Sequence, residues 1–250
     1  MAGHSKWKQI KRQKAVVDAK RGALFTKLGR DITMAAKAGG ADPAGNATLR
    51  LALLKARDNN MPADIVDRAI AKAVGGGDES QLNEIVYEGY GPGGTAVMIE
   101  AVTDNRNRTV AEIRNLFTRN GGNLGESGSV AWQFNTRGEL SLTLAKGEDG
   151  EELALLAIDA GAEDFAVDED SVTVYTRPDE LEVVRQALVE AGHEPESAEI
   201  ARVPTVTVAL EEKDALQALR LLDRLEDLDD VQRVYSNADF PDEVLASYSA

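Results

Sequence analysis

The stretch IVYEGYGPGGTAVMIEAVT, residues 85–103, sets the fold class of this chain. Two runs rich in β-branched and aromatic residues, Ile85–Tyr90 and Thr95–Thr103, flank the turn-forming residues Gly91–Gly94. Such runs, separated by glycine and proline, are typical of a β-hairpin. A strand follows the glycines and no Gly-Lys-Ser/Thr sequence appears, so we interpret Gly91–Gly94 as a tight turn and not as a phosphate-binding loop.

The residues around the hairpin extend it into a larger sheet. Thr109–Arg119 has the spacing of a helix, and Val130–Phe134 reads as a third strand. Three further elements lie near the end of the chain: Val206–Leu210, a helix over Ala215–Leu222 and the strand Val231–Tyr235. They are too few to build a hydrophobic core of their own. We therefore predict that both hairpin strands share one sheet with Val130–Phe134 and Val231–Tyr235.

Between these parts lies a segment with its own order of elements. Strand-like alternation at Leu140–Leu144 is followed by a helical pattern at Leu153–Ala160, strands near Phe165 and Val172–Val174, a helical pattern at Leu181–Leu188 and a strand near Ile200. This β-α-β-β-α-β order is that of the ferredoxin-like split unit. The order predicts a unit inserted into the central domain.

The segment from Met1 to Gly75 has the periodicity of three helices. Apolar residues recur at helical spacing over Val17–Ala38, from about Ala47, and after Pro62, and Gly75–Gly77 reads as a hinge. The predicted fold is therefore multi-domain α+β. Its parts are a basic three-helix domain (1–76), a central α+β domain completed by C-terminal elements (77–135 and 204–250) and an inserted ferredoxin-like βαββαβ domain (136–203).

The composition excludes several classes of protein. In 250 residues, 43% are hydrophobic and 28% charged, and no window approaches the ~18 consecutive apolar residues of a membrane span. With no cysteine and two histidines, disulfides, thiolate nucleophiles and cysteine metal sites are excluded. We find no catalytic constellation, and we expect no enzyme, no cofactor and no bound metal. The basic amino terminus lacks the apolar stretch of an export signal, which favours a cytoplasmic location.

The net charge of −15 conceals a split along the chain. Residues 1–74 hold 15 Lys and Arg against 6 Asp and Glu, whereas residues 75–250 hold 13 against 37. Because charges are screened beyond ~8 Å at physiological salt, the basic part can bind phosphate despite the acidic remainder.

The cations between Met1 and Gly40 are the main candidate site. Lys20, Lys27, Arg30 and Lys37 lie on one arc of the predicted first helix, and we expect them to contact phosphate; a solvated face is the alternative. Trp7, in a polar segment, is expected to stack on a base, dock in a partner or pack on its own domain. The predicted nucleic-acid-binding residues are Lys6, Trp7, Lys8, Lys11, Arg12, Lys14, Lys20, Arg21, Lys27, Arg30, Lys37, Arg106 and Arg108.

Two further charged groups have more than one interpretation. Arg106 and Arg108 lie where a helix begins, a position that favours a bound anion; a salt bridge to the acidic surface is the alternative. Asp227, Asp229 and Asp230 lie in a short turn that lacks the pattern of a calcium loop, so we interpret them as a solvated cap.

Several long motifs in order resemble the YebC family. They are Met1-Ala2-Gly3-His4-Ser5-Lys6-Trp7, Asp18-Ala19-Lys20-Arg21-Gly22 with Phe25-Thr26-Lys27, Asn60-Met61-Pro62, Tyr87–Gly94, Thr103-Asp104-Asn105-Arg106-Asn107-Arg108-Thr109 and Gly121-Gly122-Asn123-Leu124-Gly125. The resemblance implies a three-domain cytoplasmic protein of a kind usually described as a probable transcriptional regulator that binds DNA. It also points to ribosomes, since mitochondrial relatives activate translation and some members are implicated in relieving stalls at proline-rich stretches.

Three function classes follow. The favoured one is a non-enzymatic nucleic-acid-binding regulator of gene expression, acting on DNA or ribosomal RNA and so on the ribosome. The alternatives are an acidic scaffold that docks basic proteins and a metal-dependent nuclease. We expect neither a membrane nor a small-molecule partner. The sequence does not fix the oligomeric state, and a monomer is the working assumption.

Overall fold

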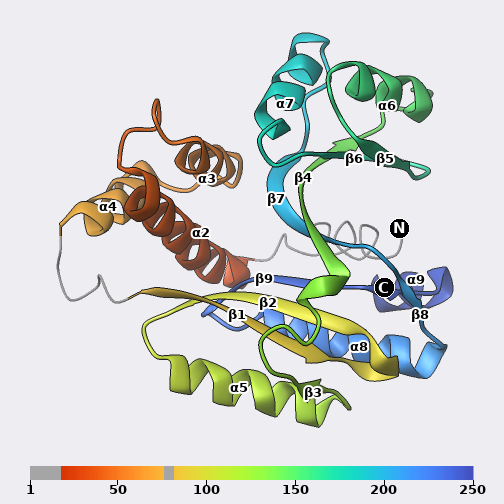
Figure 1. The fold of residues 1–250 in the computed structure, drawn as a ribbon. Helices are drawn as coiled ribbons and strands as arrows, with labels where there is room; N and C mark the ends of the chain where they lie inside the picture. Colours follow the sequence, from red (N-terminus) through yellow and green to blue (C-terminus); the bar gives the residue numbers. More distant parts are fainter. Residues whose placement is uncertain (1–17, 76–81, 250) are drawn as a thin grey trace.

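The chain folds into a helical part, a central sheet and a second sheet (Figure 1). The computed structural model describes residues 18–75 and 82–249, with side chains from 21 to 248. Four clusters of buried apolar side chains hold it together: one in the helical part, one in the second sheet's unit, and one on each face of the central sheet. The structure is thus mixed α/β with several cores.

Three helices form the helical part: α2 (Asp18–Gly39), α3 (Ala47–Asp58) and α4 (Ala63–Val74). The Asn46 side chain caps α3 by accepting a hydrogen bond from the Leu49 backbone N–H at 3.0 Å. The apolar stripes of the three helices meet in one core, as their spacing predicts. Its buried members are Leu28, Ile32, Ala35, Ala36, Leu49, Ala56, Met61 and Ala69.

The central sheet has the strand order β3-β1-β2-β9, with every pair antiparallel. Its strands are β1 (Asn83–Tyr90), β2 (Ala96–Thr103), β3 (Asn123–Leu124) and β9 (Val231–Ser236). The helices α5 (Arg106–Arg119) and α8 (Glu212–Glu226) cover one face of this sheet (Figure 1). The strand β9 pairs with β2, so the end of the chain completes the hairpin's sheet, as expected.

The prediction of a strand at Val130–Phe134 in this sheet is wrong. The edge position beside β1 belongs to β3, and Ala131–Gln133 forms a short 3-10 helix, η3. The cause is the buried Glu88 carboxylate, which accepts hydrogen bonds from the backbone N–H groups of Gly128, Val130 and Ala131, each at 2.7 Å. These donors are therefore not available to a strand partner.

The second sheet has the order β5-β6-β4-β7, and its connections run β-α-β-β-α-β. The elements are β4 (Phe134–Thr143), α6 (Gly150–Asp159), β5 (Asp164–Val167), β6 (Ser171–Thr176), α7 (Leu181–Glu190) and β7 (Ser197–Pro204). This is the order of elements in a ferredoxin-like unit. We call it the inserted unit. The exact division of the chain near residues 76, 135 and 203 stays a prediction.

The remaining elements close the central part. The hairpin between β1 and β2 turns through η2 (Pro92–Gly94), where Gly93 has φ +67° and packs so closely on Leu210 that a Cβ atom would lie 2.3 Å from it. β8 (Val208–Ala209) pairs in parallel with β10 (Ala238–Asp239), and α9 (Asp242–Ser249) follows near the end of the chain. No helix within the described ranges is long and apolar enough to cross a bilayer.

Candidate nucleic-acid interface

The turn between α8 and β9 gathers cations from two other parts of the molecule. The Asp230 side chain, 5% exposed, meets Arg30 of α2 at 3.1 Å and Arg108 of α5 at 2.7 Å. The hydroxyl groups of Thr103 and Thr109 donate to the same carboxylate at 3.1 and 2.8 Å. One carboxylate therefore joins the helical part to the central part.

This environment corrects the interpretation of Asp230 as part of a solvated cap, whereas Asp227 and Asp229 are exposed. Burial alone would raise the pKa of Asp230, but hydrogen bonds from Arg108 and Thr109 and the charge of Arg30 hold that pKa below its ordinary value. Asp230 is an ionised, buried partner of two arginines. Sequence reasoning missed it because three nearby acids in a turn usually remain in water.

Lys27 also points into this junction. Its ammonium donates to the Glu226 carbonyl, and the Arg30 guanidinium donates to the Asp229 carbonyl. Burial lowers the pKa of Lys27 to about 8, although Asp227 and Asp229 oppose the shift. The expectation of a phosphate-binding arc that includes Lys27 and Arg30 needs correction, because this face of α2 packs against the turn after α8.

Arg233 of β9 forms a second junction that sequence reasoning did not find. Its guanidinium lies 3.3 Å from Asp31 of α2, 3.7 Å from Glu100 of β2 and 3.7 Å from Glu199 of β7. Burial would lower the pKa of Arg233, but these carboxylates raise it above its ordinary value. The helical part, the central sheet and the inserted unit thus meet at one cation. The sequence signal was the only charged residue of β9, Val231–Ser236.

A groove of about 510 Å³ opens between α2, α4 and the beginning of α5. Apolar side chains line it, among them Phe25 and Leu82, and Arg68 and Lys72 of α4 add cations that are exposed. Arg68 pairs with Asp64 of its own helix at 2.7 Å. An apolar lining with cations beside it suits a ligand that has both a planar apolar part and a negative charge.

Helix α5 continues the basic surface beyond this groove. Arg106, Arg114 and Arg119 are exposed, and we call them the α5 arginines. Arg106 makes a long hydrogen bond of 3.5 Å to Asn83, while Arg114 and Arg119 have no ion pair within the part of the chain that the structure describes. This surface is open to a polyanion.

The amino terminus of α5 differs from the expected anion site. The Asn105 side chain already accepts the Arg108 backbone N–H at 3.1 Å, and the Arg108 side chain pairs with Asp104 and Asp230 at 2.9 and 2.7 Å. For Arg108, the salt-bridge interpretation is therefore the one that the structure favours.

The other predicted residues lie elsewhere. Arg21 and Lys37 are exposed near the two ends of α2, and Lys20 belongs to the first turn of that helix. The predictions for Lys6, Trp7, Lys8, Lys11, Arg12 and Lys14 fall outside the described residues.

Nothing in the described ranges forms a group of three or more potential metal ligands. His193, the one histidine in those ranges, pairs its Nδ1 atom with Glu148 at 3.0 Å on the inserted unit. The expectation of no enzyme rests on the sequence argument.

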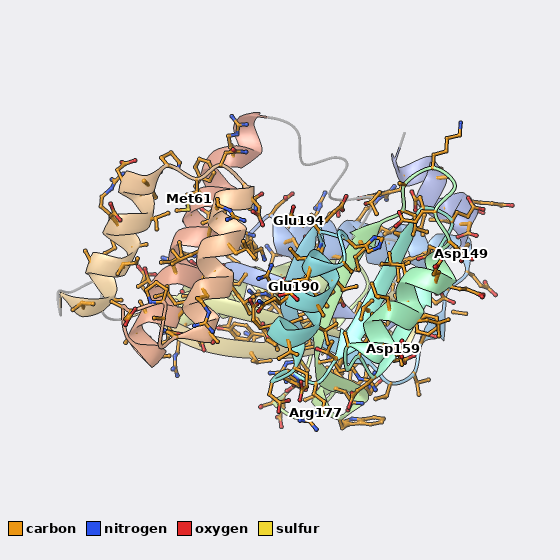
Figure 2. The ribbon with its side chains drawn as sticks, turned by 90° about the horizontal axis from the view of Figure 1, so that it is seen from above. Met61, Asp149, Asp159, Arg177, Glu190 and Glu194 are labelled. Carbon is orange, nitrogen blue, oxygen red and sulfur yellow. The ribbon has the colours of Figure 1, made fainter. Side chains whose placement is uncertain are left out.

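The acidic side chains gather on a different part of the molecule. Residues 136–203 hold 18 Asp and Glu against 5 Lys and Arg. Figure 2 shows Asp149, Asp159, Glu190 and Glu194 on the inserted unit, and Met61 in the loop between α3 and α4. Most of these acids lie on other elements than the exposed cations of α4 and α5, while Lys55 of α3 pairs with Glu199 of β7 at 3.3 Å.

Fold and surface define a multi-domain α+β protein whose exposed cations include Arg68 and Lys72 of α4 and the α5 arginines. Family models for the TACO1/YebC protein N-terminal domain and for the TACO1/YebC second and third domain match residues 5–76 and 82–238. The chain belongs to the TACO1/YebC family.

Relatives of similar length carry the description of regulators. A probable transcriptional regulatory protein of Thermomicrobium roseum is 54% identical over 245 residues, 98% of either chain, and one of Chloroflexus aurantiacus is 53% identical over the whole of both chains. The crystal structure of a conserved hypothetical protein, Aq1575, from Aquifex aeolicus superposes with a TM-score of 0.86 at 45% identity. It matches 92% of this chain and 95% of the other.

Proposed function

We propose that this protein is a non-enzymatic regulator of gene expression that binds nucleic acid, with ribosomal RNA as its target. The observation that carries the proposal is that α4 and α5, which carry exposed cations, lie away from α6 and α7 of the acidic inserted unit (Figure 1). Lysine and arginine on one surface neutralise phosphates and release counterions, which drives binding. The family of probable transcriptional regulatory proteins supports the class of function.

The choice of ribosomal RNA rests on the acidic surface. A protein that lies along free duplex DNA would bring the inserted unit, with 18 acids and 5 cations, close to flanking phosphates. On a ribosome, the same acidic surface faces basic ribosomal proteins or solvent, so the repulsion is avoided. The proposal includes a cytoplasmic location, where ribosomes work.

The test compares purified ribosomes with a random DNA duplex at about 150 mM salt. We expect at least ~10-fold tighter binding to ribosomes, and log affinity that falls linearly with log salt. The matched variants are Arg114→Ala with Arg119→Ala, which should weaken binding, and Arg177→Ala, an exposed arginine of the inserted unit that should not. Nanomolar binding to one promoter sequence without ribosome association would overturn the proposal.

A further inference from the structure

Helix α6 of the inserted unit has an exposed face that combines leucine with carboxylate. Leu155 and Leu156 are 60% and 37% exposed, and the exposed acids Glu152 and Asp159 lie three residues to either side of them. The spacing i, i+3, i+4, i+7 places all four residues on one helix face, and we call them the α6 stripe. They line a hollow of about 470 Å³. Neither carboxylate has an ion pair among the described residues.

Helix α3 of the helical part carries the same pattern with the opposite charge. Arg50 and Arg57 are exposed, and Leu53 and Leu54 between them are partly buried. These positions repeat the spacing of the α6 stripe, and we call them the α3 stripe. All four line a groove of about 310 Å³ between α3 and α7. The groove therefore combines apolar surface with a guanidinium at each end of the stripe.

The cations of this groove are open to a partner. Arg50 has no ion pair within the described ranges, and Arg57, whose side chain is 71% exposed, pairs with its neighbour Asp58 at 3.5 Å. On the α7 side, Arg185 and Glu182 pair with each other at 2.7 Å, so their charges offset. Among the described residues that line the groove, none is aromatic. The groove thus suits aliphatic side chains and carboxylates better than a nucleobase, which stacks on aromatic rings.

The two stripes of one chain do not face each other. Helix α7 lies between α3 and α6 in both views of the molecule (Figure 1, Figure 2). A second copy of the chain, however, offers each stripe its complement. The α6 stripe supplies two carboxylates and two leucines at the same spacing at which the α3 stripe supplies two guanidinium groups and two leucines.

We infer that the protein self-associates by docking the α6 stripe of one copy onto the α3 stripe of another. Both stripes repeat their charge after seven residues, ~10.5 Å along a helix, so parallel and antiparallel pairing each set a carboxylate opposite each guanidinium. The leucines between the charges leave water together. Each copy has both stripes, so a head-to-tail pair of copies makes the contact twice. This interface goes beyond the proposed function and does not depend on it.

The first measurement is sedimentation velocity of the full-length protein from about 5 to about 200 µM. A contact between single helices is smaller than the ~1,200 Å² of a stable interface, so we expect weak association that rises with concentration. Because salt screens exposed charges, the association should weaken between about 50 and 500 mM salt.

Charge reversal identifies the two surfaces. Arg50→Glu with Arg57→Glu, and separately Glu152→Lys with Asp159→Lys, set like charges opposite each other, so each double variant should self-associate at least ~10-fold more weakly than the parent. An equimolar mixture of the two variants restores opposite charges at both contacts. We expect its association to return to within about 3-fold of the parent, which also shows that both variants are folded.

A matched control separates the stripes from net charge. Arg177→Glu with Lys213→Glu reverses two exposed cations outside both stripes and makes the same change in net charge as the α3 variant. Its association should stay within about 2-fold of the parent. Leu155→Ser, at the most exposed apolar position of the α6 stripe, should weaken association by about 3-fold or more.

The remaining outcomes contradict the inference. A mixture that stays as dissociated as each variant alone means that the two stripes do not meet. Association that both double variants retain assigns the contact to another surface. A parent protein that is monomeric at every concentration leaves the two stripes to other proteins and overturns self-association. Ribosome binding by the parent is measured separately, so the failure of this interface and the failure of the proposed function are distinguishable.

Discussion

Helices α2 and α5 both carry several cations, yet they use them in opposite ways. On α2, Lys27 and Arg30 reach into the turn between α8 and β9, where carbonyl groups and Asp230 receive them. On α5, Arg114 and Arg119 are exposed and have no ion pair inside the described ranges. The comparison teaches that a row of cations in the sequence does not indicate a ligand site until the nearby carboxylates are known.

The physical reason for the difference is the position of the acidic turn. The end of α8 and the turn after it bring the backbone carbonyls of Glu226 and Asp229 and the Asp230 carboxylate beside α2, so these cations already have partners inside the protein. Paired charges inside a protein interact more strongly than exposed ones because water screens them less. We therefore expect changes in the junction to alter stability, and changes on α5 to alter binding.

The largest effect is expected from Asp230→Ala. The substitution leaves Arg30, Arg108 and two threonine hydroxyl groups without their acceptor, so it should destabilise the protein by about 3–5 kcal/mol in urea unfolding. Asp230→Asn keeps the shape and one acceptor and should cost less. A loss under about 1 kcal/mol for the alanine variant would mean that this carboxylate does not hold the junction.

A smaller effect, of opposite sign, is expected from Lys27→Met. In the unfolded chain the ammonium titrates near ~10.4, whereas the folded protein releases the proton at about 8. At pH 7, burial of the charged ammonium costs stability, so the methionine variant should be more stable by about 2 kcal/mol, after the loss of the hydrogen bond to Glu226.

The pH dependence gives the sign of this effect. Between about pH 8 and 10, the folded state binds fewer protons than the unfolded state, so the Lys27 contribution to the free energy of unfolding rises with pH. The advantage of Lys27→Met over the parent should therefore vanish by about pH 10 in paired urea titrations. An advantage that is the same at pH 7 and pH 10 would contradict the burial of a charged Lys27.

The sequence predicts most of the elements but few of the long-range charges. The spacing of apolar residues predicts the bounds of α2, α3, α4 and both hairpin strands to within a few residues of those observed. The reason is that each element buries an apolar stripe whose period is set locally in the sequence. The predicted strand at Val130–Phe134 is wrong, because an apolar run also fits a turn. Here the buried Glu88 carboxylate stabilises that turn by accepting backbone hydrogen bonds. Arg30 and Asp230 lie near opposite ends of the chain, and no local pattern indicates that they meet.

The third prediction concerns the exposed region. Arg114→Ala with Arg119→Ala should lower the slope of log affinity against log salt by about 2 and weaken ribosome binding by about 10-fold at physiological salt. The free energy of unfolding should change by no more than about 0.5 kcal/mol, because both side chains are exposed. The matched variant Arg30→Ala should instead lower stability, because it breaks the pair with Asp230, and leave the slope unchanged. If the α5 pair and Arg30→Ala exchange these effects, the assignment of α2 to the junction and of α5 to the interface is wrong.

The smallest effect is expected at Arg68, which is exposed like the α5 arginines but also has an ion-pair partner, as Arg30 does. It is 67% exposed beside the groove and pairs with Asp64 one turn earlier, at 2.7 Å, so Arg68→Ala should cost at most about 0.5 kcal/mol of stability. Asp64→Ala breaks the same pair and should cost a similar amount. For RNA the two variants should differ in sign, because the first removes a cation from the groove and the second exposes one. Equal losses of RNA affinity in both would mean that Arg68 serves only its ion pair and that the basic surface begins at α5.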